Sequence, residues 1–347
     1  MLKKLALILA IAAVVGTAAF ITLRMNSMAL MRSYIERKVP STLQQQTVTD
    51  RRFEIVFCGT GSPLYQPDRA QPCLGVVAGG RFFLFDAGQG ASRQLHAVGA
   101  PILSLDAVYL THLHSDHISG VGDVLHNGWL YGRRNQVNLV GPPGTTKFLN
   151  GVRQSFEDDM HERQRIVGIK PDGSHLDMAK ARDLKIEGDG AIPVYSENGV
   201  LISAFRVDHP AWDFAYGYKI EYGGKTVVVS GDTRYTPAIV THARDADLLI
   251  HEAVNLEMMR TITKAVAKHG GNVDPKRIER IRTTHTPTNE VATAAAKAGV
   301  ERLVLTHLIP PIPALGFIEG AFIKGMDKIY DGEIVVARDG MRIKLLE

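Results

Sequence analysis

The sequence predicts a mixed α/β domain preceded by an apolar N-terminal helix, and three observations support this prediction. An uncharged, mostly apolar run extends from Leu5 to Leu23. From Arg52 onward, short runs rich in β-branched and aromatic residues alternate with glycine-rich turns. Stretches with helical periodicity lie between those runs. Because 45% of the 347 residues are hydrophobic and 22% are charged, the chain can bury a full core, which excludes a disordered or fibrous protein.

The N-terminal run has the length and flanks of a membrane-targeting segment. Lys3 and Lys4 precede it and Arg24 follows it. Its nineteen residues, as a helix, span about the thickness of the bilayer hydrocarbon, whereas the apolar region of a cleaved signal peptide is usually shorter. We therefore predict that residues 1–24 are an uncleaved signal-anchor, inserted in the membrane through residues 5–23. The alternative is a signal peptide cleaved near Gly16-Thr17-Ala18, which would release a secreted protein.

The net charge of +4 belongs to the N-terminal arm. Eight basic and two acidic side chains precede Phe53, a net charge of +6, so the remaining 295 residues carry −2. A near-neutral body argues against nucleic acid as a partner, because RNA affinity depends on clustered Lys and Arg. Residues 25–51 are polar and glutamine-rich, and we predict a linker or stalk there, with a turn or two of helix at Met28–Ile35 and a break at Pro40.

Residues 52–347 are predicted to form one domain, because no change of composition divides them. The two cysteines, Cys58 and Cys73, are predicted to be buried thiols rather than a disulfide. The predicted strands are Phe53–Phe57, Gly75–Val77, Phe82–Phe85, Val108–Leu110, Val137–Val140, Ile202–Val207, Tyr218–Tyr222, Thr226–Ser230, Leu248–Ile250 and Leu303–Leu305. The predicted helices are Ala91–Val98, His117–His126, Thr145–Glu157 and Asn289–Ala298, and the polar segment 151–199 has no assigned role.

A dense group of metal-binding side chains follows the predicted strand that ends at Leu110. His112 and His114 are two residues apart in an extended segment, so their side chains point the same way and can bind one ion. Asp116 and His117 begin a helix and can turn toward a second ion. Four nitrogen and carboxylate donors within six residues match metal chemistry better than packing.

Two ions need further ligands, and three candidates follow other predicted strands. His209 follows the strand that ends at Val207, Asp232 follows Thr226–Ser230, and His307 follows Leu303–Leu305. Open α/β folds place their reactive groups where strands meet loops. The sequence therefore offers five histidines and two aspartates as ligands.

These motifs together resemble the metallo-β-lactamase-fold hydrolases, in the branch that contains tRNase Z, arylsulfatase and phosphodiesterase relatives. The resemblance covers Phe53 to about Leu346. It implies a four-layer αββα sandwich that forms a catalytic domain, with the ions at one edge. It rests on Phe57-Cys58-Gly59-Thr60-Gly61-Ser62, Phe85-Asp86-Ala87-Gly88, the His-rich run, His209 ahead of Tyr216-Gly217-Tyr218, Ser230-Gly231-Asp232-Thr233, His251-Glu252-Ala253 and Thr306-His307-Leu308.

The resemblance also implies which residues bind each ion. His112, His114 and His209 would bind one ion, Asp116, His117 and His307 the other, and Asp232 would bridge both. Histidine rather than glutamate at position 114 favours two hydrolytic Zn²⁺ ions, although the same ligands also accept Mn²⁺ or Fe²⁺. Relatives of this branch are often dimers, so a homodimer is the implied assembly.

The expected chemistry is hydrolysis by a hydroxide that bridges the two metals. Asp116 would orient the water and accept its proton. His251 would protonate the leaving group, with Glu252 fixing its orientation, a role that the resemblance to tRNase Z suggests; a purely supporting histidine is the alternative. Asp86 is expected to anchor a ligand. His285 either reaches the edge of the site or serves the helix that begins at Asn289.

The chain departs from tRNase Z in lacking its tRNA-binding arm. Enzymes that carry this arm insert it between the Gly-Tyr strand and the Ser-Gly-Asp-Thr motif, and only Lys219–Ser230 separates them here. We therefore predict a metal-dependent hydrolase of a small phosphate or sulfate ester, anchored to a membrane with its catalytic domain on the extracytoplasmic side. The alternatives are a lactonase or β-lactamase, a tRNase Z-like endoribonuclease, and a non-catalytic binding module.

Overall fold

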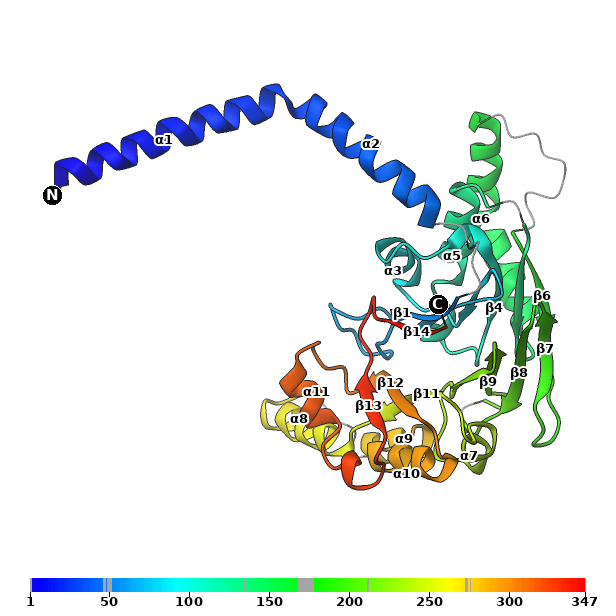
Figure 1. Ribbon diagram of the computed structural model, residues 1–347. Coiled ribbons are helices and arrows are strands. Elements are labelled where there is room, and N and C mark those ends of the chain that lie inside the picture. Colours follow the sequence, from blue (N-terminus) through cyan, green and yellow to red (C-terminus); the bar gives the residue numbers. More distant parts are fainter. Residues whose placement is uncertain are drawn as a thin grey trace. The chain divides into compact units, whose positions relative to one another are not determined.

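The computed structural model describes residues 2–45, 48, 52–133, 135–167, 178–210, 212–271, 274 and 276–346 (Figure 1). The chain divides into two compact units, Met1–Thr47 and Val48–Glu347. Each is described separately below.

The first unit consists of helices α1 (Leu2–Met25) and α2 (Ser27–Gln45). Within α1, Lys3–Met25 is long and apolar enough to cross a membrane, and none of it is buried. Helix α2 continues past Pro40, so the predicted break there is wrong. The fixed φ of proline lies in the helical range, so proline costs a helix a hydrogen bond without forcing it to end. Residues 46–47 and 49–51 of the predicted linker lie outside the described residues.

The second unit contains two seven-stranded mixed sheets (Figure 1). The first has the order β14-β1-β2-β3-β4-β5-β6, with bounds β14 (Arg342–Leu346), β1 (Phe53–Gly59), β2 (Cys73–Ala78), β3 (Arg81–Phe85), β4 (Leu105–Tyr109), β5 (Val137–Gly141) and β6 (Ala179–Asp183). The second has the order β13-β12-β11-β10-β9-β8-β7, with bounds β13 (Glu333–Val336), β12 (Arg302–Ile309), β11 (Leu248–Val254), β10 (Lys225–Val229), β9 (Tyr216–Tyr222), β8 (Val200–Arg206) and β7 (Ile192–Glu197).

Helices cover the outer faces of both sheets. Over the first sheet lie α3 (Ala91–Ala97), α4 (Ser115–Ile118), α5 (Val121–Leu130) and α6 (Thr145–Val167), with a 3₁₀ turn at Ile102–Ser104. With the second sheet are associated α7 (Pro237–His242), α8 (Leu256–Lys268), α9 (Arg277–Thr284), α10 (Thr288–Ala298) and α11 (Gly316–Phe322), with a 3₁₀ turn at Met326–Lys328.

The buried core confirms the predicted four-layer αββα sandwich. One cluster lies between the sheets, where Phe83 and Tyr109 of the first sheet share it with Tyr218 and Ile250 of the second. A second cluster packs α3, α5 and α6 on the first sheet, and a third packs α7, α10 and α11 on the second. All of the described core residues belong to Val48–Glu347, so this unit has a core of its own.

All ten predicted strands overlap observed ones, but four strands and several helices were not predicted. The missed strands β6, β7, β13 and β14 are the outermost strands of the two sheets. The predicted helix His117–His126 is two helices, α4 and α5, separated at Gly120. A side chain there would not fit, because a Cβ on Gly120 would lie 2.1 Å from the carbonyl oxygen of Gly88.

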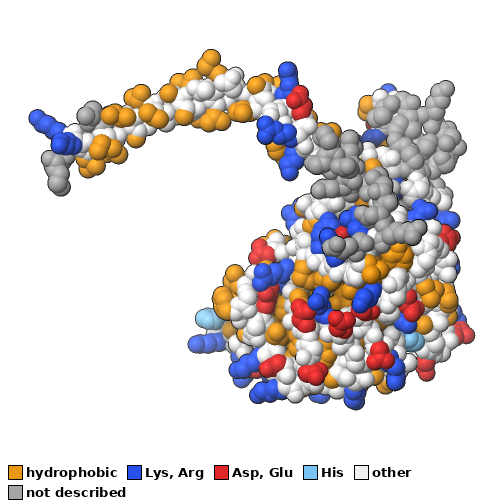
Figure 2. Space-filling model, in the orientation of Figure 1, with side chains coloured by type: hydrophobic (Ala, Val, Ile, Leu, Met, Phe, Trp, Pro, Cys, Tyr) orange, Lys and Arg blue, Asp and Glu red, His pale blue; other side chains and the backbone are white. Residues whose placement is uncertain are grey.

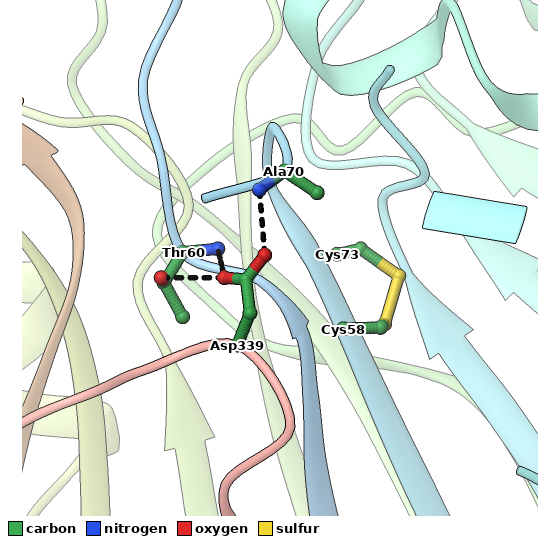
Figure 3. The surroundings of a disulfide bond; sticks show 5 residues. All are labelled: Cys58, Thr60, Ala70, Cys73 and Asp339. Atoms are coloured by element: carbon green, nitrogen blue, oxygen red, sulfur yellow. Dashed lines mark hydrogen bonds between the residues drawn. A yellow bond between two sulfur atoms is a disulfide. The ribbon is translucent and has the colours of Figure 1, made fainter. Parts of the chain in front are cut away.

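The prediction that Cys58 and Cys73 are free thiols is wrong, because they form a disulfide (Figure 3). Cys58 and Cys73 lie on the antiparallel neighbours β1 and β2, and their Cα atoms are 4.9 Å apart, within the range that a disulfide requires. The bond closes the loop between these strands. The Asp339 carboxylate holds the same loop by accepting hydrogen bonds from the Thr60 backbone and hydroxyl and from Ala70 N–H.

Candidate metal centre

The His-rich run lies where β4 ends at an edge shared by the two sheets. The run leaves β4 as an extended segment through His114, and α4 then begins at Ser115. Asp116 and His117 therefore lie in the first turn of a helix, as predicted, while His112 and His114 precede it. Both histidines of the extended segment point to one place, since His112 Nε2 lies 2.8 Å from His114 Nδ1.

Four of the predicted ligands form the first donor group. His209 joins His112 and His114 from the loop after β8, with its Nε2 3.4 Å from His114 Nδ1. Asp232 joins them from the loop after β10, with its Oδ2 3.8 Å from His112 Nε2. Three imidazoles and one carboxylate are a ligand set that suits zinc.

The second donor group consists of Asp116, His117 and His307. His307 Nε2 and His117 Nε2 lie 3.3 Å and 3.5 Å from Asp116 Oδ2. The same two nitrogens each lie 3.3 Å from Asp232 Oδ2. One carboxylate oxygen of Asp232 is thus adjacent to both groups, which is the position that a bridging ligand requires.

The burial and charge of these residues fit bound cations. His117 Nε2 is buried and has no hydrogen-bond partner among the described residues, although it faces two carboxylates. Burial lowers the pKa of His117, but the charges of Asp232 and Asp86 outweigh burial and hold it well above the usual value. The carboxylates therefore make the centre favourable for positive charge. Burial, together with the charge of His117, holds the pKa of His112 well below its usual value, which keeps this imidazole in the neutral form that binds metal.

Neighbouring groups fix the orientation of the donor rings. Asp86 accepts hydrogen bonds from Thr111 N–H and from the Thr111 hydroxyl, and its Oδ2 lies 2.7 Å from His117 Nδ1. This contact leaves Nε2 of His117 for a metal, and it fits the anchoring role expected of Asp86. His209 Nδ1 lies 2.9 Å from the carbonyl oxygen of Thr284, so its Nε2 likewise faces the centre.

The structure does not bring His251 into either donor group. Its side chain is fully buried, and its Nδ1 lies 2.6 Å from the backbone carbonyl oxygen of Glu252. Burial lowers the pKa of His251. Residues alternate across a strand, and the neighbours Leu249 and Ala253 of this strand belong to the cluster under the outer helices. His251 therefore faces away from the centre.

His285, which the sequence left with two alternative roles, lies at the centre instead. Its ring centroid lies 5.4 Å from that of His307 and 5.6 Å from that of His209. Its Nδ1 lies 3.4 Å from Glu252 Oε1 and 3.9 Å from Asp232 Oδ2. Together with Asp232 and His307, His285 also forms a third group of donor atoms that could hold an ion. Burial lowers the pKa of His285, but the charges of Glu252 and Asp232 outweigh burial and raise the pKa to about 9.

Glu252 is fixed by the backbone around it. Its Oε1 accepts a hydrogen bond of 2.8 Å from Thr286 N–H and one of 3.4 Å from Thr233 N–H. Glu252 thus connects the segment that carries Asp232 with the one that carries His285. The expected partnership of Glu252 with a histidine is present, but the partner is His285 rather than His251.

The fold and the donor groups define an αββα sandwich protein with a cluster of His and Asp side chains that could hold metal ions. A family model described as "Beta-lactamase superfamily domain" matches residues 81–308, and the chain belongs to this superfamily. The predicted resemblance is thereby confirmed.

Sequence relatives and solved structures extend this assignment. The chain is 33% identical over 264 residues to a protein named Ribonuclease Z from Mycobacterium marinum, covering 75% of this chain and 88% of the relative. Among solved structures, the metallo-β-lactamase fold protein YhfI from Bacillus subtilis has a TM-score of 0.58 at 20% identity, over 84% of this chain and 99% of that one. The short form of human tRNase Z has a TM-score of 0.56 at 20% identity, over 84% and 98%.

Proposed function

We propose that the protein is a dinuclear zinc phosphodiesterase that acts on small substrates and is held at a membrane. The observation that carries this proposal is the position of Asp232, whose Oδ2 lies 3.3 to 3.8 Å from nitrogens of both donor groups. His112, His114 and His209 would hold one Zn²⁺, Asp116, His117 and His307 the other, and Asp232 both. Two ions bound there would lower the pKa of a shared water and would neutralise charge that develops on a phosphoryl group.

The remaining steps belong to residues of the chain. Asp116 is the carboxylate of the second group, and we assign it the orientation of the attacking water and the acceptance of its proton. His285 lies beside both groups, and the carboxylate of Glu252, 3.4 Å from its Nδ1, favours its protonated form. It is therefore our candidate for the acid that protonates the leaving oxygen, with Glu252 holding the ring.

A phosphodiester is favoured over a sulfate ester or a carbonyl substrate by the sequence relatives. A ribonuclease cleaves a phosphodiester, and the relatives that are 33% identical bear the name Ribonuclease Z. An alkoxide leaving group of a diester also needs an acid, which His285 supplies. These points support hydrolysis of a phosphodiester, but they do not distinguish a small substrate from a large one.

A small substrate is favoured by the short connection between β9 and β10. Only Gly223 and Gly224 join these two strands, so no arm is inserted there. RNA is the second candidate, and the names of the relatives favour it. The two candidates differ in the substrate and share the metal chemistry.

The location at a membrane rests on α1 and on the disulfide. Helix α1 contains a segment able to cross a bilayer. Disulfides persist in oxidising compartments and are rare in the cytosol, so the Cys58–Cys73 bond supports a catalytic domain on the extracytoplasmic side. A homodimer remains a prediction from the resemblance.

The proposal is tested with the unit that starts at Val48, purified and analysed for metal. We expect about two zinc ions per chain, hydrolysis of bis(p-nitrophenyl) phosphate, and loss of activity on chelation that added zinc restores. The substitution His112→Ala should abolish activity and zinc binding, while His96→Gln, at a histidine outside the centre, should change neither.

Other substrates separate the alternatives. The same preparation is offered p-nitrophenyl sulfate, a lactone and a precursor tRNA. Turnover of precursor tRNA alone would refute the small-substrate proposal in favour of RNA processing. A protein that binds no metal, with His112→Ala indistinguishable from the parent, would refute the metal centre itself.

A further inference from the structure

Helices α8 and α9 form a hairpin whose two ends belong to the metal centre. Helix α8 begins at Leu256, four residues after Glu252, and its N-cap Asn255 accepts a hydrogen bond from Met258 N–H. Helix α9 ends at Thr284, whose carbonyl oxygen orients His209, and His285 follows directly. The hairpin is therefore fixed at the site, and the rest of it extends outward with mostly exposed side chains.

This hairpin concentrates positive charge in a body that is otherwise acidic. Residues 256–284 contain seven Lys and Arg and three Asp and Glu, a net charge of +4. Because residues 53–347 carry −2, the rest of the body carries −6. The net charge of −2 is therefore the sum of a basic hairpin and an acidic remainder.

Three cations form one stripe along α8. Arg260, Lys264 and Lys268 are spaced four residues apart, so they share a face of the helix, and all three are exposed. No ion pair to any of them is found among the residues that the structure describes. A fourth exposed cation, Lys276, lies just before α9. The stripe is therefore available to a negatively charged partner.

The opposite face of α8 is apolar, and only its first turn is covered. Met259 is buried in a small cluster with Val254 and Ile309. Further along the same side, Ile262 and Val266 are 44% and 41% exposed. A face that is buried at one end and open at the other lacks a partner for its outer half.

Helix α11, whose end adjoins the N-terminus of α8, begins with exposed apolar side chains. Asn255 Nδ2 donates a hydrogen bond of 2.8 Å to the carbonyl oxygen of Phe322, at the end of α11, so the two helices are neighbours (Figure 1). Leu315 and Phe317 are 48% and 77% exposed. Figure 2 shows hydrophobic side chains beside Lys and Arg at the margin of the body where α8 lies.

We propose that α8 and the start of α11 form a docking surface for a bilayer that contains anionic lipids. Amphipathic helices that lie on membranes combine a Lys- and Arg-rich face with an apolar face that enters the headgroup boundary, and α8 has both. Each cation near an anionic surface adds attraction, and the hairpin carries +4 whereas the rest of the body carries −6. The exposed Ile262, Val266 and Phe317 favour a bilayer over RNA, because phosphate contacts alone require no apolar side chains.

The test measures binding of the unit that starts at Val48 to vesicles, since this unit has its own core and lacks α1. We expect sedimentation with phosphatidylglycerol vesicles and little with phosphatidylcholine. The triple variant Arg260→Gln/Lys264→Gln/Lys268→Gln should bind on the order of a hundredfold more weakly. The matched control Lys147→Gln/Lys180→Gln/Lys185→Gln removes the same charge from exposed positions elsewhere and should stay within about threefold of the parent.

A second variant tests the apolar contribution. Ile262→Ser/Val266→Ser should lower vesicle binding by at least about tenfold while leaving binding of a single-stranded RNA oligonucleotide unchanged. Thermal unfolding of each variant confirms that it is folded. The proposal is overturned if the two triple variants bind vesicles equally, or if the unit binds the RNA, ignores the vesicles and loses RNA binding with the α8 triple variant.

Discussion

His285 occupies the position from which a side chain can serve both donor groups. It lies between His209 and His307, and the carboxylate of Glu252 is 3.4 Å from its Nδ1. His251, one residue before that carboxylate, lies on the other face of β11. His251 adjoins Glu252 in sequence and His285 adjoins it in space, but only His285 faces the donor groups, where a substrate would bind.

Substitution of these two histidines should therefore have unequal effects. We expect His285→Ala to lower kcat by about 10²- to 10⁴-fold while zinc content stays the same, because an acid is lost and none of the seven proposed ligands is removed. A loss of zinc would instead assign His285 to the third donor group, with Asp232 and His307. His251→Gln should leave kcat nearly unchanged. The loss in His285→Ala should be larger for an alkyl leaving group than for p-nitrophenolate, which needs little protonation. Equal losses for both leaving groups would argue against the acid role.

Asp86 tests the second donor group without removing a ligand. Its φ is +57°, a left-handed conformation that asparagine also adopts, so Asp86→Asn should fold. The change removes the charge beside His117 Nδ1 and should weaken zinc binding at the second group by about 10- to 100-fold, as measured by competition with a chelator. Asp123→Asn, at an exposed position of α5, is the control and should leave zinc affinity unchanged.

At the scale of elements, β6 caps a helix that is distant in sequence. The Asp183 carboxylate, at the end of β6, accepts hydrogen bonds from Gly144 N–H, Thr146 N–H and the Thr146 hydroxyl at the start of α6. Burial raises the pKa of Asp183, but these three hydrogen bonds outweigh burial and hold the pKa below its usual value. Asp183 therefore supplies stability in its charged form.

Removing this cap should destabilise the protein in a pH-dependent way. We expect Asp183→Ala to lower the free energy of unfolding by about 1 kcal/mol at pH 7. Because the folded pKa is depressed, the contribution is present above the unfolded pKa of about 3.9 and is lost as the pH falls through the folded value. Urea unfolding at pH 7 and at pH 3 measures the difference, which should narrow at the lower pH. A gap of equal size at both pH values would contradict a charged cap.

The disulfide between β1 and β2 gives another prediction at this scale. It closes a loop of fifteen residues, for which loop-closure entropy gives about 3 kcal/mol of stabilisation. Cys58→Ser/Cys73→Ser should lower the stability of the unit that starts at Val48 by about this amount. A reductant should lower the Tm of the parent and leave that of the variant unchanged. If the reductant did not change the Tm of the parent, the disulfide would be contradicted.

Buried strands could be predicted from the sequence, whereas strands at the edges of the sheets could not. Strands that are buried on both faces consist of apolar runs, and all ten that were predicted overlap observed strands. Ala179–Asp183 escaped notice because three of its five residues are charged, which an outermost strand tolerates. The disulfide was missed because fifteen residues of sequence separation do not reveal that β1 and β2 are neighbours.

The metal ligands of the candidate site could be predicted from the clustering of donor residues, but the acid could not, because its assignment depends on which way a side chain points. All seven proposed ligands come together, because they lie near the ends of β4, β8, β10 and β12, or in the segments that follow them, at a common edge of the two sheets. The acid role was assigned to His251 because the resemblance to tRNase Z suggested it. The alternation of side chains along the strand argues against His251. Leu248 and Ile250 face the other sheet, and Glu252 lies on their side of the strand, whereas His251 lies on the other side.

At the scale of the whole molecule, charge and apolar surface are distributed in a way that suits work at a membrane. The arm through Arg52 carries +6, residues 256–284 carry +4, and the remainder carries −6. The proposed docking surface adjoins the centre, because Glu252 and His285 flank the hairpin on either side. If the docking surface and the proposed phosphodiesterase activity both exist, a substrate held in the bilayer is brought to the centre by docking.

This combination predicts a difference between two substrates with the same reactive group. The first is hexadecyl p-nitrophenyl phosphate dispersed in phosphatidylglycerol vesicles, and the second is bis(p-nitrophenyl) phosphate in solution. At vesicle concentrations below saturation, we expect Arg260→Gln/Lys264→Gln/Lys268→Gln to lower turnover of the first substrate by up to about a hundredfold, the same factor as for vesicle binding. Turnover of the second substrate should not change. An equal loss on both substrates would mean that the substitutions damage the centre. No loss on either, with vesicle binding reduced, would mean that the bilayer does not deliver the substrate.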